Sequence, residues 1–324
     1  MGWTAAARGE LLDRRLGCGA WSYRNGLGAA VEPTALAILG LVVPGRDASA
    51  DVSSAVRGGA DWLSERQRAD GSLGVSPALP EVGWATPLAV LAWCALGVYP
   101  AARRRAVNFL LRSSGLKVAQ PGPRERVVGH DTTLLGWSWL KGTHSWVEPT
   151  AMAILALSVE GEGGHPRVLE GLRLLVDRAV PGGGWNYGNR EVFGRQLRAQ
   201  PGPTGLALLA LAAGKATSPE TVVGPAVDFL KAVLPDLRSS VSLGWGVLGL
   251  RAWGDCPPEA ERWLEESFRL HGRRPDSTAG VALLLAAADP NLLSALGFDS
   301  GPERRASDSQ TSGIGRHTPG GGKS

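Results

Sequence analysis

The chain of 324 residues has few of the sequence features that are typical of secreted or membrane-spanning proteins. Its three cysteines, Cys18, Cys94 and Cys256, are widely spaced and odd in number, which fits neither a disulfide framework nor a zinc ribbon. No 18 consecutive apolar residues occur, so no membrane span is expected. Glu10 and Asp13 stand where a signal peptide would be apolar. We therefore expect reduced thiols and a cytoplasmic location.

Excess charge of either sign is also lacking. The chain has 34 Lys and Arg against 30 Asp and Glu, and its formal net charge is +4. The arginines are scattered through helical segments and form no stripe, so no nucleic-acid partner is expected. No cofactor is expected either. Hydrophobic residues make up 44% of the chain, which is enough for a sizeable core.

The segment GCGAWSYRNG (Gly17–Gly26) lacks the residue that would make its cysteine reactive. An internal thioester joins a cysteine to a glutamine three residues later, but Trp21 stands at that distance from Cys18. The segment is informative for another reason. WSYRNGLGAAVEPTALAILGL (Trp21–Leu41) aligns without gaps with WSWLKGTHSWVEPTAMAILAL (Trp137–Leu157), and 12 of the 21 positions are identical. The chain is therefore built from internal repeats.

Each repeat pairs an amphipathic helix with a helix that is apolar nearly all round. In PRVLEGLRLLVDRAV, Val168, Leu172 and Leu175 recur every three to four residues, and charged residues occupy the other side. ALAILGL and AMAILAL have no polar face and must be covered on all sides. The pattern predicts six hairpins, namely 4–16 with 31–43, 52–67 with 84–97, 101–113 with 146–159, 166–178 with 201–213, 219–233 with 240–253, and 257–271 with 277–288.

Six such hairpins form either a closed ring or an open solenoid. A solenoid needs a polar cap at each end, and the last apolar helix, AGVALLLAAA, has none. We therefore predict an all-α fold, an α6/α6 toroid of two concentric helical barrels, as a single domain over residues 1–290. Residues 291–324 are rich in Gly, Ser and Pro and are predicted to be a disordered tail.

The repeats resemble those of the superfamily of squalene–hopene cyclases, oxidosqualene cyclases and protein prenyltransferases. The resemblance lies in WLSERQRADGSLG, with Leu73 in place of the usual Trp of a Q-x-x-D-G-S-x-G turn, in GGGWNYGN, and in the two segments that end in VEPTA. It covers about residues 4–288. It implies the toroid and a terpenoid cyclase-like activity on a polyprenyl or other apolar substrate. Full-length triterpene cyclases carry two such barrels, and this chain has room for one.

The resemblance also implies a position for a catalytic acid. In proton-initiated cyclases the acid lies in an Asp-x-Asp-Asp-Thr-Ala segment that starts an inner helix. Alignment on Thr-Ala places Glu148 at the proton donor, with Trp146 and Pro149 in place of the other carboxylates, and Glu32 is its counterpart in the first repeat. The alternative is a scaffold role, since Pro33 and Pro149 suit the first helical position and a glutamate suits a helix N-terminus.

Two further sets of residues are candidates for a site. His130 and Asp131 lie together in the longest connection of the ring, and the alternative for them is a surface histidine beside a helix cap. Trp146, Trp84 and Tyr187 are expected at the rim of a central cavity, where aromatic faces stabilise cations. The turn tryptophans of the repeats are expected to pack between helices.

The resemblance to prenyltransferases does not extend to their zinc site. Asp255 and Cys256 are adjacent, where Asp-x-Cys is required, and His271 follows on the next helix. No metal is expected. Two hypotheses remain for the function. One is a terpenoid cyclase-like enzyme with Glu148 or Asp131 as the acid, and the other is a non-catalytic scaffold or a module that binds a lipid or protein.

Overall fold

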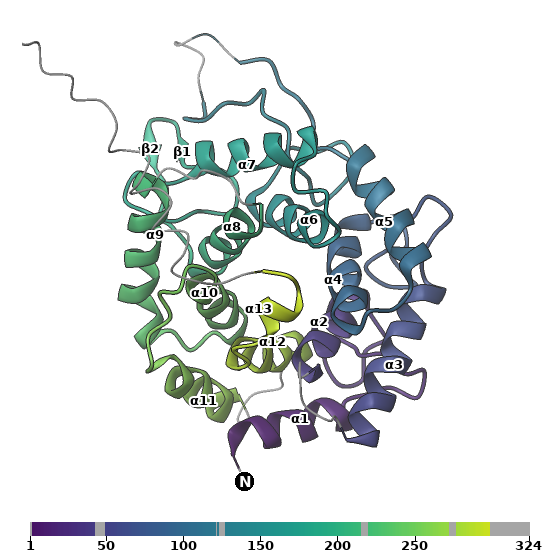
Figure 1. Ribbon diagram of the computed structural model, residues 1–324. Helices are drawn as coiled ribbons and strands as arrows, with labels where there is room; N and C mark the ends of the chain where they lie inside the picture. Colours follow the sequence, from purple (N-terminus) through teal and green to yellow (C-terminus); the bar gives the residue numbers. More distant parts are fainter. Residues whose placement is uncertain are drawn as a thin grey trace, which may run out of the picture.

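The computed structural model describes residues 2–42, 49–120, 122, 127–214, 220–271 and 277–298 (Figure 1). The all-α class is confirmed, because helices make up nearly all of the regular structure in these ranges. They also contain one short antiparallel hairpin, β1 (Glu191–Val192) with β2 (Arg195–Gln196), in the connection between two helices. Within the same ranges, none of the helices combines the length and the apolar content needed to cross a bilayer.

The helices alternate between an outer and an inner position along the chain (Figure 1). The outer helices are α1 (Trp3–Asp13), α3 (Ala50–Glu65), α5 (Pro100–Arg112), α7 (Pro166–Arg178), α9 (Glu220–Val233) and α11 (Ala260–His271). The inner helices are α2 (Val31–Leu41), α4 (Thr86–Leu96), α6 (Val147–Val159), α8 (Pro201–Ala213), α10 (Ser240–Ala252) and α12 (Thr278–Ala288). Short 3-10 turns, η1 (Gly83–Ala85) and η2 (Leu234–Asp236), precede α4 and α10. The predicted helices 166–178 and 201–213 coincide with α7 and α8.

The inner helices form a closed ring. Each of them packs against the next inner helix along the chain, and α12 packs against α2, which closes the ring. Each outer helix packs on the inner helix of its own hairpin. In α2, α6 and α12 nearly every residue is buried, because a helix without a polar face is stable only where neighbours cover its whole surface.

A short helix, α13 (Leu292–Ala295), lies in the middle of this ring (Figure 1). It follows α12 and therefore enters the ring at the end where the inner helices end. The side chains of Leu292, Leu293, Leu296 and Phe298 are buried there. Residues 291–298, which were predicted to be part of the tail, thus pack against the ring. Residues 299–324 of the predicted tail lie outside the described residues.

A buried threonine fixes the start of four inner helices. Thr34 Oγ1 accepts a hydrogen bond from the Trp21 N–H at 3.0 Å and donates to the carbonyl oxygen of Ala30 at 2.7 Å. The same N–H···Oγ1 bond, at 2.9 Å each time, joins Leu73 to Thr86, Trp137 to Thr150 and Trp185 to Thr204. These threonines are fully buried, so without the hydroxyl the backbone N–H would have no partner.

The turn tryptophans connect helices in two ways. The indole N–H groups of Trp21, Trp137 and Trp185 donate to carbonyls near the ends of the outer helices, at Leu11 (2.7 Å), Leu110 (2.9 Å) and Leu175 (2.6 Å). The rings also reach the next hairpin. A Cβ on Gly59 of α3 would lie 2.8 Å from the Trp21 ring, and one on Gly171 of α7 would lie 2.9 Å from the Trp137 ring. Each of these two tryptophans therefore bonds its own hairpin and packs against its neighbour.

The substitution Thr150→Val tests this threonine contact. Valine keeps the shape of the side chain but leaves the buried N–H of Trp137 without an acceptor, so we expect a loss of about 2–3 kcal/mol in the free energy of unfolding. Urea unfolding followed by circular dichroism measures it. Thr143→Val, which removes an exposed hydroxyl bond to Leu140, is the matched control and should change the stability by less than about 0.5 kcal/mol. Equal losses in the two variants would contradict the assignment.

Candidate functional site

Two glutamates lie at the end of the ring where the inner helices begin. Glu32 and Glu148 each occupy the second position of their helices, α2 and α6. Leu36 and Leu39, which follow Glu32 by four and seven residues, line the central lumen, as does Leu155, seven residues after Glu148. Residues with this spacing share one face of a helix. Both carboxyl groups therefore point towards the axis of the ring, about 10 Å from Leu39 and Leu155 along the helices.

Burial changes the proton affinity of this glutamate pair. The pKa of Glu148 is raised to about 7, mainly because burial disfavours the charged form and secondarily because the negative charge of Glu32 is near. Burial also raises the pKa of Glu32, and a hydrogen bond from Tyr23 partly opposes this effect. A helix N-terminus favours a carboxylate, but here burial outweighs it. A large fraction of Glu148 is thus protonated at neutral pH.

The prolines of the VEPT segments stand two positions later than expected. Pro33 and Pro149 are the third residues of their helices, not the first. They remain within the first turn, where a backbone N–H has no acceptor inside the helix, so a residue without an N–H costs nothing there. The segment starts the helix as predicted and also turns its glutamate towards the lumen, so the two interpretations are compatible.

Trp84 lies in the 3-10 turn η1, directly before α4, the inner helix between those that carry the two glutamates. The alignment of Thr86 with Thr34 places Trp84 at the position of Glu32, and Leu91, seven residues later, lines the lumen. Its ring packs edge-on against that of Trp139, with 4.8 Å between the ring centroids and 80° between the planes. Trp84 thus belongs to the rim that carries the glutamates.

Trp146 and Tyr187 lie beside Glu148. Trp146 directly precedes α6, and its ring lies against Gly188, where a Cβ would come within 2.7 Å of the indole. The N–H of Val147 donates to the carbonyl oxygen of Tyr187 at 2.9 Å. The Tyr187 side chain is about half exposed, at 48%. The structure therefore brings both aromatic residues to the same rim as Glu148.

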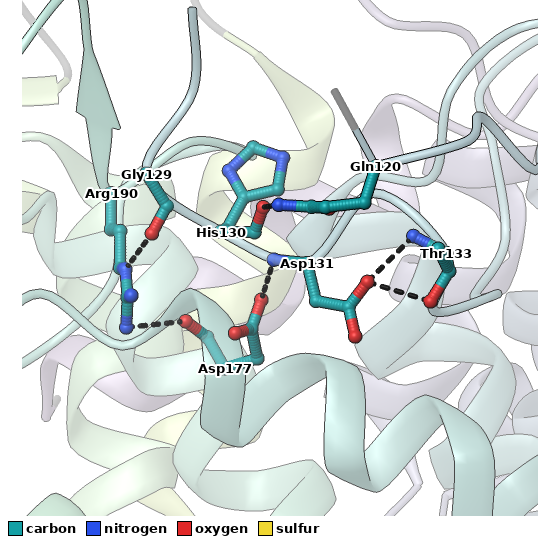
Figure 2. A pocket seen from close by; sticks show the side chains of 7 residues that line it. All are labelled: Gln120, Gly129, His130, Asp131, Thr133, Asp177 and Arg190. Atoms are coloured by element: carbon teal, nitrogen blue, oxygen red, sulfur yellow. Dashed lines mark hydrogen bonds between the residues drawn. The ribbon is translucent and has the colours of Figure 1, made fainter. Parts of the chain in front are cut away.

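The other candidate pair lies in a separate polar cavity of about 370 Å³ (Figure 2). It is located where the outer helix α7 ends, on the same end of the ring as the glutamates. Its walls come from the long connection after α5, from the end of α7 and from the loop with the β-hairpin. The residues that line it are Gln120, Gly129, His130, Asp131, Thr133, Asp177 and Arg190.

His130 is not a surface histidine and Asp131 is not a helix cap, which were the alternatives for this pair. His130 is only 6% exposed, and its Nδ1 has no hydrogen-bond partner among the described residues. Burial and the charges of Arg178 and Arg190 lower its pKa to about 3, so the ring is neutral at pH 7. Asp131 caps no helix, because its Oδ1 accepts from the N–H (2.8 Å) and Oγ1 (2.6 Å) of Thr133 in a turn. These bonds lower the pKa of Asp131, which is therefore ionised.

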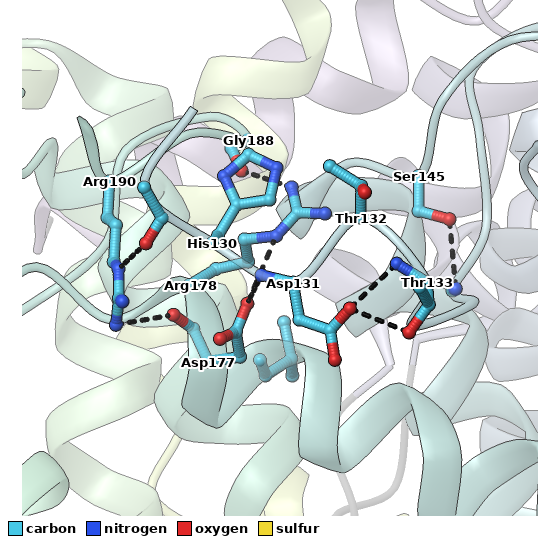
Figure 3. A network of polar contacts seen from close by, with 12 residues as sticks. His130, Asp131, Thr132, Thr133, Ser145, Asp177, Arg178, Gly188 and Arg190 are labelled. Atoms are coloured by element: carbon cyan, nitrogen blue, oxygen red, sulfur yellow. Dashed lines mark hydrogen bonds and ion pairs between the residues drawn. The ribbon is translucent and has the colours of Figure 1, made fainter. Parts of the chain in front are cut away.

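Two arginines join the three parts of the chain that form this cavity (Figure 3). Arg178 Nη1, at the end of α7, donates to the carbonyl oxygen of Gly188 at 2.5 Å. Arg190 donates from Nε to the Gly129 carbonyl at 2.6 Å and from Nη1 to the Asp177 carbonyl at 3.2 Å. Since Gly188 also touches Trp146, the polar cluster and the glutamate rim adjoin each other.

Three residues of these sites were missed by the sequence reasoning. Tyr23 lies two residues after the turn Trp21 and bonds Glu32, but nothing in the repeat pattern marks it. Arg178 reads as one more charge on the outer face of an amphipathic helix. Arg190 had a usable signal, because it lies in the connection between Trp185 and Thr204, which is six residues longer than in the other repeats.

Comparison with solved structures shows which known proteins share this fold. Solved type II terpene cyclases match along nearly their whole length. One is a variant of MstE from Scytonema, in complex with geranylgeranyl dihydroxybenzoate. It has 15% sequence identity and a TM-score of 0.58, and the match covers 92% of this chain and 97% of that chain. The chain has the fold of the type II terpene cyclases.

Two other solved structures agree with this likeness. A second MstE variant, in complex with merosterolic acid A, has 15% identity over 90% of this chain and 96% of that one, with a TM-score of 0.59. A protein from Actinoplanes has 19% identity over 91% and 99%, with a TM-score of 0.57. No protein-family model and no curated protein matches the sequence.

The substitution Glu148→Gln tests the burial of the acid. The folded-state pKa of about 7 exceeds the ordinary 4.5, so the folded wild type holds the proton more tightly and loses stability as pH rises from 4.5 to 7. Glutamine does not titrate, so the variant should gain roughly 1–3 kcal/mol relative to wild type between pH 4.5 and pH 8. Urea unfolding at both pH values measures this difference. The exposed Glu65→Gln is the control, and a difference independent of pH would contradict the burial of Glu148.

Proposed function

We propose that the chain is an α6/α6 toroid of the terpenoid cyclase kind that cyclises a polyprenyl or similar apolar chain, with Glu148 as the proton donor. The observation that carries the proposal is the buried Glu148 carboxyl group, which has a pKa of about 7 and lies seven residues before Leu155 of the lumen wall. The shared fold with type II terpene cyclases supports it, since one of them is bound to a geranylgeranyl compound.

The electrostatics favour Glu148 over Asp131 as the acid. A general acid must be protonated at the working pH, and burial keeps a large fraction of Glu148 in that form. Asp131 accepts two hydrogen bonds from Thr133 and is held as a carboxylate. In this proposal His130 and Asp131 position the connection beside the rim, and only Glu148 donates a proton.

The strength of this acid indicates the kind of group that it protonates. A carboxylic acid of pKa about 7 is a weaker donor than an ordinary glutamic acid, and a terminal epoxide accepts a proton more readily than an alkene does. The proton of Glu148 passes to the epoxide oxygen as the C–O bond breaks, and the neighbouring double bond closes the ring on the resulting cation. Loss of a proton from the last cation to the glutamate pair makes product and substrate isomers. Trp84 and Trp146 supply aromatic faces near the cation.

A second candidate function is a binding or scaffold module without catalysis. The observation that favours it is the state of the lumen, whose free volume is about 30 Å³. Pockets for small molecules of drug size have volumes of roughly 300–1,000 Å³. With α13 in place, the lumen therefore has no room for a polyprenyl chain.

The catalytic proposal is tested by incubating the purified protein with geranylgeranyl compounds and their terminal epoxides, followed by gas chromatography and mass spectrometry. We expect cyclic isomers from wild type and a loss of about 100-fold or more in rate for Glu148→Gln, which has no acidic proton to donate. Glu65→Gln, at an exposed position, should react like wild type. Equal rates for Glu148→Gln and wild type would remove Glu148 from the mechanism. Absence of product from every substrate would favour the binding module.

A further inference from the structure

The lumen of the ring is filled by the chain's own C-terminal segment. Its wall consists of apolar side chains from inner helices, among them Leu36, Leu91 and Trp245. The segment that fills it, residues 291–298, will be called the plug. Four plug side chains lie against this wall, those of Leu292, Leu293, Leu296 and Phe298. They place about 19 apolar carbon atoms in the lumen, roughly as many as a chain of four isoprene units has.

In the part of the chain that the structure describes, the hydrogen bonds of the plug are formed within the plug and with Asp289. The N–H groups of residues 295–298 donate to carbonyl oxygens within the plug, and the N–H of Asn291 donates to the side chain of Asp289. Examples are the bonds from Leu296 to Leu292, at 3.1 Å, and from Phe298 to Leu293, at 2.9 Å. Among the described residues, the contacts between the plug and the wall of the lumen are apolar.

The plug is also amphipathic. Leu292, Leu293, Leu296 and Phe298 are buried, whereas Asn291, Ser294, Ala295 and Gly297 are exposed. Gly297 has φ +78°, a left-handed conformation that turns the chain so that Phe298 follows the leucines into the lumen. A segment with one apolar face and its own hydrogen bonds can leave as a unit, and an apolar ligand would replace the surface that it covers.

We propose that the plug is a displaceable intramolecular occupant of an apolar ligand site, and that an apolar chain of about 20 carbon atoms binds the lumen by expelling it. This inference rests on the proposed function only in taking the lumen as the ligand site, and it does not depend on catalysis by Glu148. The plug lowers the apparent affinity for the ligand, because only the fraction of molecules with an empty lumen can bind.

The first experiment compares full-length Leu293→Asp with the control Ser294→Asp, which adds the same charge at an exposed neighbouring position. A carboxylate is not stable in the apolar lumen, so Leu293→Asp should release the plug. We expect it to bind the fluorescent probe N-phenyl-1-naphthylamine about tenfold or more tightly than wild type, with geranylgeraniol as competitor, while Ser294→Asp stays at the wild-type value. Equal probe affinity in all three folded proteins would overturn the proposal. Loss of the helical circular dichroism signal in Leu293→Asp alone would show that the plug is a fixed part of the core.

A second measurement uses wild type and needs no variant. Chymotrypsin cleaves after Leu and Phe, so a released plug exposes sites at Leu292, Leu293 and Phe298. Geranylgeraniol should accelerate cleavage in this segment several-fold and leave the ring helices intact, as read by mass spectrometry. Unchanged or slower cleavage would overturn the proposal. Accelerated cleavage without cyclic products would keep the plug and reject only catalysis, so the two proposals fail separately.

Discussion

The structure depends on one contact, the hydrogen bond from a turn residue's backbone N–H to a fully buried threonine hydroxyl at the start of an inner helix. It recurs in four hairpins at nearly the same length, for example at 3.0 Å for Thr34 and 2.9 Å for Thr150. The bond determines where each of these four inner helices begins, and so places their first turns at one end of the ring. That placement also sets the direction in which the side chain of the second helical residue points, and this residue is a glutamate in two hairpins.

The two ends of the lumen have opposite characters. Where the inner helices begin, the rim carries carboxyl groups and aromatic rings, and burial keeps much of Glu148 protonated. Further along the helices, the lumen is lined mainly by leucines and contains plug side chains such as Leu293 and Phe298. A substrate with one reactive end and a long apolar body matches this polarity. Glu148 and the apolar wall are positioned by the same inner helices.

Much of the fold was predictable, because the repeats carry two independent signals. The alternation of amphipathic and apolar helices gave the hairpins, and the 116-residue offset between Trp21 and Trp137 aligned them. The plug was missed because NLLSALGF is too short to show a helical period and borders a segment rich in Gly, Ser and Pro. The direction of Glu148 was also undecided, since a glutamate at a helix start fits both a cap and a lumen. Only the ring closure, which depends on contacts far apart in sequence, distinguishes them.

The loop between Trp185 and Thr204 shows how such a ring can acquire new surface. It is six residues longer than its counterparts and contains the β-hairpin, yet the bond between Trp185 and Thr204 is still 2.9 Å long. The number of residues between the tryptophan and the threonine therefore differs between repeats, whereas the hydrogen bond between them stays the same. Connections at this end of the ring can change in length without a change in the packing of the core. Arg190 shows that the added residues can contribute side chains next to the rim. Diversity among rings of this kind would accumulate in these loops without any change in the helices that carry them.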